Sequence, residues 1–477
     1  MSVEGKQKLR LLVTIASFGT SHDQYLDRLV EEYRSMSFDV DIVVMSNVAK
    51  PVPAGVELLV GLPTKDPWSL PFGHKKVLAE RLESYDLFAY CEDDTLATER
   101  NIEAFLRVSA VMPANEIPGF IRYEEQPDGT ITYCDVNGHY HWDPASVVRR
   151  GEYTFAFFSN EHAAFYLLTQ AQLRRAIQSG GFLVAPHRGK YDLACTAATD
   201  PYTQCGFQKL LCISHLDEFL LHHLPNKYVG TRFGTHQSVF HKQMHALMQM
   251  AQNGSHVSAL FQTETRLQDA WYSKDFYEPV RSLVVKEIPI AAREVLSIGC
   301  GSGETERWLA NRGARVTAVC IDPIIGACAQ GDGVEAIWGD LENIKKKLVG
   351  RTYDCLLLSN VLHLAAHPAE LLAAFGSLLV PDGHCVILVP NLGKLKNVLG
   401  KLRGEKVFRP IGNFEESGTH DVKVSVLRKW LSAAKVHLTK TSYIVSEPKQ
   451  KVSRLALGVA DPLLANEILF VGRKAPN

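Results

Sequence analysis

The stretch that decides the fold is Val295-Leu296-Ser297-Ile298-Gly299-Cys300-Gly301-Ser302-Gly303-Glu304. Its apolar half predicts a buried strand, its glycines predict a tight turn, and Glu306–Asn311 predicts the helix that follows. Glycines let a backbone approach a ligand more closely than any side chain would allow. Dinucleotide sites use the same geometry, so the glycine pattern alone leaves the ligand open.

Three further features follow the glycine-rich turn in order. Val316–Ile321 predicts a strand that ends in Asp322, an acid able to accept both hydroxyls of a ribose. The next strand ends in Gly339-Asp340, where the acid can meet an adenine amino group. A turn, Leu378-Leu379-Val380-Pro381-Asp382-Gly383, then leads into a strand over Cys385–Val389.

Together these features resemble class I S-adenosylmethionine-dependent methyltransferases, over about residues 270 to 475. The resemblance implies an α/β domain with a Rossmann-like sheet. It also implies that the methyl donor, S-adenosylmethionine, is bound by Gly299, Gly301, Gly303, Asp322 and Asp340. A nicotinamide-binding domain would explain the glycines and Asp322, but neither Asp340 nor the Leu-Leu-x-Pro turn. The family often has an acid where this chain has Ser297.

The acceptor side is predicted from Pro390-Asn391 and Thr419-His420, which resemble methyltransferases that accompany polysaccharide biosynthesis. A hydroxyl acceptor needs a base, and histidine has a suitable unperturbed pKa. His420 is the first candidate for the base, and His363 and His367 are its rivals. Any of the three can instead be structural.

The N-terminal half alternates strands and helices, which predicts a largely parallel sheet with ligands at the carboxyl ends of its strands. One predicted strand, Leu87–Cys91, ends in Glu92-Asp93-Asp94. Clustered carboxylates repel one another unless a cation lies between them. Their oxygens suit Mn²⁺ or Mg²⁺ bound to a diphosphate. The alternative is a solvated acidic turn.

With the preceding helix and strand, this acidic cluster resembles the nucleotide-binding half of GT-A-type glycosyltransferases, clearly over residues 9–106. The resemblance implies an N-terminal GT-A-like mixed sheet, a nucleotide-sugar donor and an oligosaccharide or lipid-linked glycan acceptor. The residues it implies for binding the nucleotide-sugar are Thr14, Ser17, Lys75 and Asp93. The metal ligands it implies are Glu92, Asp94 and His222, with His223 as the alternative to His222. The acids it implies for a base are Asp217 and Glu218.

We expect three segments: a GT-A-like domain over 1–254, a linker over 255–267 and a methyltransferase domain over 268–477. The linker is indicated by the polar run Gln252–His256. Lys plus Arg total 51 and Asp plus Glu 52, a balance that argues against a nucleic-acid binder. No apolar run is long enough for a membrane span. Ten cysteines without a CxxC pair indicate reduced thiols. A cytoplasmic enzyme is expected, free or peripheral at a membrane through a lipid-linked acceptor.

The sequence therefore predicts a bifunctional enzyme that adds a sugar to a glycan and O-methylates a sugar hydroxyl. A second reading keeps the methyltransferase and makes the N-terminal half a noncatalytic glycan-binding module. A third is a small-molecule or protein methyltransferase fused to an unrelated α/β domain.

Overall fold

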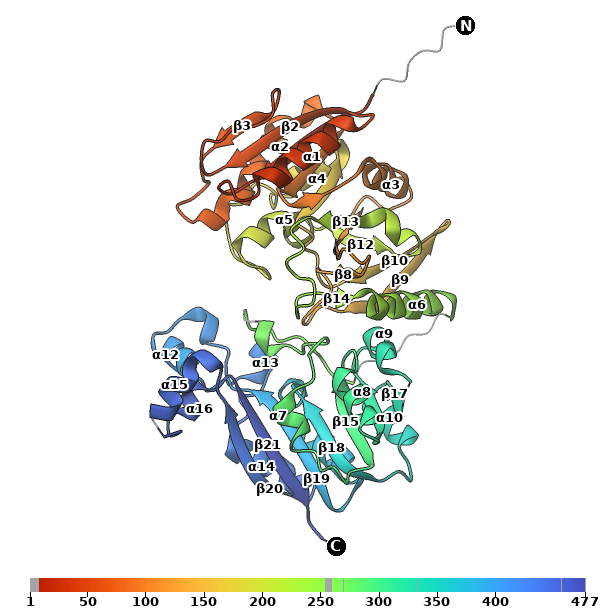
Figure 1. Cartoon of the computed structure of the whole chain (residues 1–477), viewed down its shortest axis with the longest axis vertical. Coiled ribbons are helices and arrows are strands. Elements are labelled where there is room, and N and C mark those ends of the chain that lie inside the picture. Colours follow the sequence, from red (N-terminus) through yellow and green to blue (C-terminus); the bar gives the residue numbers. More distant parts are fainter. Residues whose placement is uncertain (1–7, 254–259, 269, 332, 456, 477) are drawn as a thin grey trace. The chain divides into compact units, whose positions relative to one another are not determined.

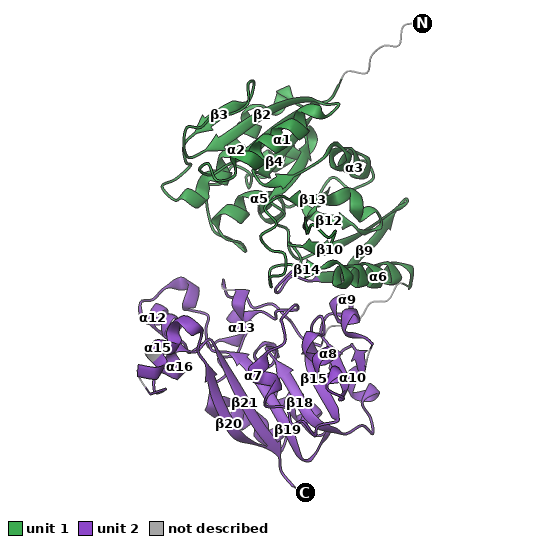
Figure 2. Ribbon diagram, viewed as in Figure 1, with its two compact units in different colours: residues 1–136, 142–254 green, residues 137–141, 255–477 purple. Residues whose placement is uncertain are grey.

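The computed structural model describes residues 8–253, 260–268, 270–331, 333–455 and 457–476. The chain forms two compact units (Figure 2): unit 1 contains residues 1–136 and 142–254, and unit 2 contains residues 137–141 and 255–477. The linker expected over 255–267 begins with residues outside the described ones, and Gln252 and Asn253 before it end a helix. No helix of the described ranges is long and apolar enough to cross a membrane.

The first sheet of unit 1 has the strand order β11-β4-β1-β2-β3. Its strands β2 and β3 are labelled in Figure 1. Its first four strands in chain order are parallel, and β11 is antiparallel to β4. β1 and β4 are buried along almost their whole length, as expected for continuous apolar strands covered on both faces. The bounds are β1 (Arg10–Ala16), β2 (Asp39–Ser46), β3 (Glu57–Val60), β4 (Leu87–Glu92) and β11 (Phe165–Thr169).

Two smaller sheets complete unit 1. One has the order β6-β12-β10-β9 and the other the order β14-β8-β7-β13-β5. The strands of the first are β6 (Glu116–Pro118), β9 (Trp142–Arg150), β10 (Tyr153–Phe158) and β12 (Gln208–Cys212). Those of the second are β5 (Thr95–Leu96), β7 (Ile121–Glu125), β8 (Ile131–Tyr133), β13 (Leu220–His223) and β14 (Thr235–His236). Because β4 and β5 are separated only by Asp93 and Asp94, the acidic cluster joins the first sheet to the third.

The helices of unit 1 include α1, which buries Leu26, Leu29, Val30 and Tyr33 on one face. The α-helices are α1 (Asp23–Ser35), α2 (Gly73–Glu80), α3 (Glu99–Ser109), α4 (Gln170–Gln178), α5 (Leu193–Thr203) and α6 (Gln237–Asn253). The 3₁₀ helices are η1 (Pro67–Phe72), η2 (Leu82–Ser84) and η3 (Ile213–Phe219).

Unit 2 is built on a sheet with the order β17-β16-β15-β18-β19-β21-β20. The strands from β17 to β19 are parallel, and β21 is antiparallel to both β19 and β20. The strands are β15 (Glu294–Cys300), β16 (Arg315–Cys320), β17 (Val334–Ile337), β18 (Tyr353–Ser359), β19 (Leu379–Pro390), β20 (Val436–Ile444) and β21 (Glu467–Lys474). The order reverses at β15, and in open α/β sheets ligands bind at the carboxyl ends of strands at such a reversal.

Helices lie between the parallel strands of unit 2, which gives the Rossmann-like arrangement expected there. The α-helices are α7 (Ser282–Val285), α8 (Glu304–Asn311), α9 (Pro323–Gly326), α10 (Leu341–Lys347), α11 (Pro368–Gly376), α12 (Leu395–Leu402), α13 (Phe414–Ser417), α14 (Val424–Ala433), α15 (Glu447–Leu455) and α16 (Asp461–Leu464). The 3₁₀ helices are η4 (Ala270–Tyr272), η5 (Ala327–Ala329), η6 (Leu362–Leu364) and η7 (Lys406–Phe408).

One segment differs from the expectation. The predicted Leu-Leu-x-Pro turn is an irregular part of β19, in which Asp382 has a φ of 62°. This difference does not move the carboxyl ends of β15 and β16.

Candidate functional site

The glycine-rich turn lies at the carboxyl end of β15, where the strand order reverses. Gly299 and Gly303 have φ values of 86° and 90°, a region that favours glycine. A Cβ on Gly301 would lie 2.1 Å from the carbonyl oxygen of Phe276, so no side chain fits there. Gly303 begins α8, whose N-terminus points its amide groups toward the turn. The turn therefore offers a close backbone surface to a ligand.

Asp322 and Asp340 follow β16 and β17, so both lie at the same edge of the sheet as the turn. Oδ1 of Asp322 accepts hydrogen bonds from the amides of Ile324 and Ile325, each at 2.7 Å. Burial raises the pKa of Asp322 to about 6. Asp340 caps α10 by accepting a hydrogen bond from the amide of Asn343 at 2.8 Å. The buried carboxylate of Asp322 fits a ribose, since Oδ2 makes no hydrogen bond with any residue in the described ranges.

The chain resembles several known methyltransferases. A family model described as a methyltransferase domain matches residues 269–419. The ubiquinone biosynthesis O-methyltransferase of Xylella fastidiosa is 29% identical over 187 residues, 37% of this chain and 74% of that protein. The protein of the same name from Xanthomonas oryzae pv. oryzae is 26% identical over 189 residues, 37% of this chain and 77% of that protein. A solved S-adenosylmethionine-dependent methyltransferase from Mesorhizobium loti aligns with 18% identity and a TM-score of 0.31, over 40% of this chain and 96% of that one.

The C-terminal unit carries a class I S-adenosylmethionine-dependent methyltransferase domain. The family match lies within unit 2 and includes the glycine-rich turn, Asp322 and Asp340. The family match begins at residue 269, after the end of unit 1 at residue 254.

His363 of the methyltransferase domain lies in η6, directly after β18. Its Nε2 is 2.8 Å from the carbonyl oxygen of Tyr272, and its Nδ1 is buried without a partner among the described residues. Burial lowers the pKa of His363 to about 3, so the ring is neutral at pH 7. Asn360 and Thr419 also have a buried oxygen without a partner in the described part of the chain.

His420 of the methyltransferase domain precedes α14. Its backbone amide donates to the carbonyl of His363 at 2.8 Å, and its ring stacks on Phe414 with centroids 4.4 Å apart. Nε2 is 3.0 Å from the carbonyl oxygen of Ala365. Burial lowers the pKa of His420, although that carbonyl opposes the shift. The two histidines are therefore linked through the backbone and both neutral at pH 7.

His367 and Asn391 were also expected on the acceptor side. His367 is exposed and is the residue before α11. The side-chain amide of Asn391 donates to the carbonyls of Pro462 and Ala465, at 2.8 and 3.0 Å. Asn391 therefore holds the segment around α16.

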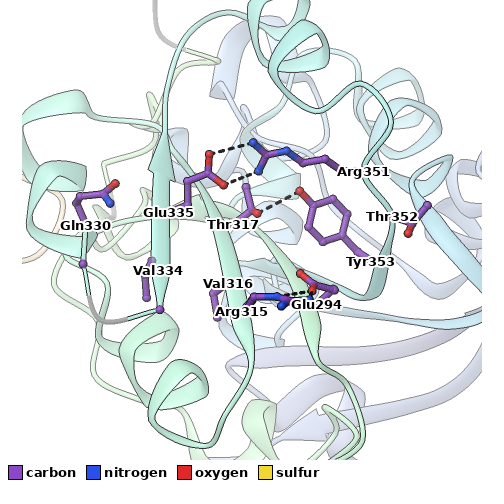
Figure 3. Close-up of a pocket in the computed structure, with 12 residues that line it drawn as sticks. Glu294, Arg315, Val316, Thr317, Gln330, Val334, Glu335, Arg351, Thr352 and Tyr353 are labelled. Atoms are coloured by element: carbon purple, nitrogen blue, oxygen red, sulfur yellow. Dashed lines mark hydrogen bonds and ion pairs between the residues drawn. The ribbon is translucent and has the colours of Figure 1, made fainter.

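A groove of about 740 Å³ lies at the opposite edge of the methyltransferase sheet, at the amino ends of β15 to β18 (Figure 3). Its charged side chains are paired, Arg315 with Glu294 and Arg351 with Glu335. The hydroxyl groups of Thr317 and Tyr353 share a hydrogen bond of 3.1 Å. None of the expected donor-binding residues lines this groove, and its charges are already balanced.

In unit 1, the acidic cluster lies at the carboxyl ends of β1 and β4. Ser17 donates to Asp93 at 2.5 Å, and Nδ1 of His22 lies 2.9 Å from the other oxygen of Asp93. Nδ1 of His22 is also 3.7 Å from Asp94. Ligand atoms of His22, Asp93 and Asp94 all lie within 4.8 Å of one another, close enough to hold one metal ion. An imidazole and two carboxylates form a donor set that fits Mn²⁺ or Mg²⁺.

The predicted third metal ligand, His222, does not join this cluster. Its ring stacks on Tyr123, with centroids 5.0 Å apart. The next residue, His223, places Nε2 at 3.4 Å from Asp94 and Nδ1 at 2.6 Å from Glu124. Successive side chains of a strand point to opposite faces, so in β13 only one of the two histidines can face the acids.

The pKa values of the three acids in the acidic cluster are shifted in different directions. Burial opposes ionisation of Asp94, but the hydrogen bond and charge of His223 and the charges of Arg122 and Lys227 together outweigh it and lower the pKa to about 2. Burial, together with the charge of Asp94, raises the pKa of Glu92 to about 7. Burial also raises the pKa of Asp93, although Ser17 and His22 oppose the shift. Glu92, Asp93 and Asp94 therefore lose their protons over different pH ranges, as acids at many functional sites do.

The other residues predicted in unit 1 are more scattered. Thr14 donates its hydroxyl to the carbonyl of Ala89 at 2.9 Å, a bond between β1 and β4. Lys75 forms a buried ion pair with Asp200 and lines a groove of about 550 Å³ at the ends of β2 and β3. Asp217 pairs with Arg100 of α3, and Glu218 lies 2.7 Å from Arg107 of the same helix.

Sequence reasoning missed His22, Lys50 and Glu124. Lys50 donates to Ser17 at 2.6 Å and to Asp23 at 2.7 Å, so it holds Ser17 in place. The one available indication of His22 was its place in the polar segment between β1 and α1. Glu124 could not be found from the sequence, because its role depends on the parallel register of β7 and β13.

Proposed function

We propose that this chain transfers the methyl group of S-adenosylmethionine to a hydroxyl oxygen, and that the acceptor is a sugar of a glycan. The observation that carries the proposal is the pair of neutral histidines, His363 and His420, directly after β18 and before α14. S-adenosylmethionine supplies an electrophilic methyl group when it is bound. Relatives named ubiquinone biosynthesis O-methyltransferase support oxygen as the methylated atom.

His420 is the proposed base. A carbonyl oxygen only accepts hydrogen bonds, so Nε2 of neutral His420 carries the hydrogen toward Ala365, and Nδ1 has the lone pair. In the proposed step the acceptor oxygen forms its bond to the methyl carbon as the sulfur–carbon bond breaks. The hydroxyl proton moves to Nδ1 of His420. Positioning supplies much of the rate in such an in-line displacement.

The test is a methyl-transfer assay with the full chain and a methyl donor that carries an isotopic label. The acceptors are short oligosaccharides, a catechol and an unrelated protein, and mass spectrometry identifies the product. Label on a sugar oxygen is the expected result. Label only on the catechol or on the protein would contradict a glycan acceptor while leaving the methyltransferase intact.

A second candidate function, metal-dependent transfer of a sugar from a nucleotide-sugar, is favoured in unit 1 by one observation. His22, Asp93 and Asp94 form a cation-sized cluster at the carboxyl ends of β1 and β4. The strands β1 to β4 of this sheet are parallel, as in α/β domains that bind ligands at the carboxyl ends of their strands. A bound Mn²⁺ or Mg²⁺ would neutralise the departing diphosphate. The competing function of unit 1 is noncatalytic glycan binding.

Nucleotide-sugar hydrolysis distinguishes the two functions of unit 1. A glycosyltransferase slowly hydrolyses its own donor without an acceptor, and the reaction should stop with EDTA and resume with Mn²⁺. A panel of nucleotide-sugars, followed by chromatography of the released nucleoside diphosphate, measures this. Glycan binding without any nucleotide-sugar hydrolysis would favour the noncatalytic module.

A further inference from the structure

The strand before the glycine-rich turn has a hydroxyl at Ser297, where related domains often have an acid. A carboxylate nevertheless lies beside this position. Ser297 donates its hydroxyl to Oε1 of Glu306 at 2.6 Å, and the two residues are only 2% and 6% exposed. Glu306 comes from the first turn of α8, the helix that follows the N-cap residue Gly303. Both side chains line the same hollow as Gly299, Gly301 and Ser359.

This buried carboxylate lacks a positive partner. Its side-chain neighbours are the hydroxyl of Ser297 and the thiol of Cys300, which are neutral. None of the ion pairs formed by the described residues includes Glu306. The N-terminus of α8 offsets part of the charge, but an unpaired buried carboxylate remains costly. A cation that enters the hollow would relieve that cost, so Glu306 points to a positively charged ligand group.

We infer that Glu306 binds the α-ammonium group of the methyl donor. It thereby replaces the acid that related domains often have at the position of Ser297. The inference rests on the assignment of S-adenosylmethionine to this domain. An ammonium group offers three hydrogen-bond donors to a carboxylate, whereas the sulfonium offers none. Ser297 is the positioning residue, because its hydroxyl fixes one carboxylate oxygen. Asp322, at the end of the neighbouring strand β16, is left for the ribose.

The test compares two ligands of the full chain by calorimetry. S-adenosylhomocysteine has the ammonium group and no sulfonium, and 5′-methylthioadenosine lacks the whole amino-acid portion. Glu306→Gln should weaken binding of S-adenosylhomocysteine about tenfold or more, the scale of a hydrogen bond to a charged group. Its affinity for 5′-methylthioadenosine should stay within about twofold, because Asp322 and the loop glycines are unchanged.

A double variant serves as the matched control. Ser297→Asp in the Glu306→Gln background returns an acid to the strand and should restore most of the affinity for S-adenosylhomocysteine. The melting temperature of ligand-free Glu306→Gln should equal or exceed that of the wild type, because a buried unpaired charge is removed. Equal losses for both ligands with a lower melting temperature would make Glu306 structural and overturn the inference. Unchanged affinity for S-adenosylhomocysteine would also overturn it. A wild type that binds neither ligand would contradict the donor assignment itself.

Discussion

Nε2 of His363 lies 2.8 Å from the carbonyl oxygen of Tyr272, and this contact fixes the protonation of the ring. Because the carbonyl only accepts, Nε2 carries the hydrogen of the neutral imidazole, and Nδ1 has the lone pair. Tyr272 belongs to η4, four residues before Phe276, whose carbonyl oxygen accepts a hydrogen bond from the amide of Ser302 at 2.7 Å. His363 therefore braces the segment that covers the glycine-rich turn.

The contact between His363 and the carbonyl of Tyr272 predicts that His363→Leu lowers the stability of the folded chain. The substitution removes the hydrogen bond between His363 and the carbonyl of Tyr272, at a cost of about 0.5–1.5 kcal/mol. Scanning calorimetry of the full chain should show a lower melting temperature for one transition. His363→Gln can keep an N–H donor and should recover part of the loss. If His363→Gln melts like the wild type but loses more than about a hundredfold in methyl transfer, the size of a general-base effect, His363 is the base.

His420→Ala should lower methyl transfer far more than it lowers donor binding. A general base contributes about 10²–10⁴-fold to the rate. The stacked ring of His420 contacts none of the residues assigned to the donor, so the affinity for S-adenosylhomocysteine should change less than about twofold, the loss of one neutral contact at most. Initial rates and calorimetry on the same preparation measure both effects. A rate loss below about threefold would remove His420 as the base.

Donor binding should weaken in acid through Asp322. Burial raises the pKa of this carboxyl to about 6 in the free protein. The ionised carboxylate is the better acceptor for ribose hydroxyls, so the donor binds the ionised form preferentially and affinity rises as the pH rises through 6. Between pH 7.5 and pH 5 the affinity for S-adenosylhomocysteine should fall about tenfold through this linkage.

Asp322→Asn is the matched control for that pH dependence. The amide oxygen of the asparagine can still cap α9, whereas alanine would also lose the two bonds from Ile324 and Ile325. The variant should bind more weakly at pH 7.5 and show a nearly flat pH profile. A wild-type profile that is already flat would separate Asp322 from the donor.

The local parts of the proposed donor site could be predicted from the sequence, because each is a strand followed by its own turn. Gly299, Gly303 and Asp322 lie within a few residues of the strand that positions them. Glu306 was missed, since its contact with Ser297 depends on how the first turn of α8 folds back on β15. The one indication in the sequence was Ser297, which has a hydroxyl where related domains often have an acid.

In the unit 1 cluster, the sequence could predict the acids but not the histidines that lie beside them. Glu92, Asp93 and Asp94 lie at the end of one strand, but His22, the residue before α1, and His223 of β13 reach them through contacts distant in sequence. The choice between His222 and His223 depends on which face of β13 is buried, and a shift of one residue reverses it. Asp217 and Glu218 were expected as bases, but they pair with arginines of α3, which the sequence gives no way to foresee.

The cation site of unit 1 gives the most decisive prediction, since it determines whether the chain is one enzyme or two. His22, Asp93 and Asp94 are close enough to bind one Mn²⁺, and His223 faces Asp94. Calorimetric titration of the full chain should detect one Mn²⁺ site. Each of the substitutions Asp94→Ala and His22→Ala should weaken Mn²⁺ binding at least about tenfold, since each removes a ligand.

His222→Ala is the matched control, because this neighbour stacks on Tyr123 and should leave Mn²⁺ affinity unchanged. Methyl transfer by Asp94→Ala should survive, because the methyltransferase domain lies in a separate compact unit with its own core. Equal Mn²⁺ affinity in the wild type and in a well-folded Asp94→Ala would reduce the cluster to a set of internal hydrogen bonds. Loss of binding in His222→Ala but not in His22→Ala would place the metal on the other face of β13.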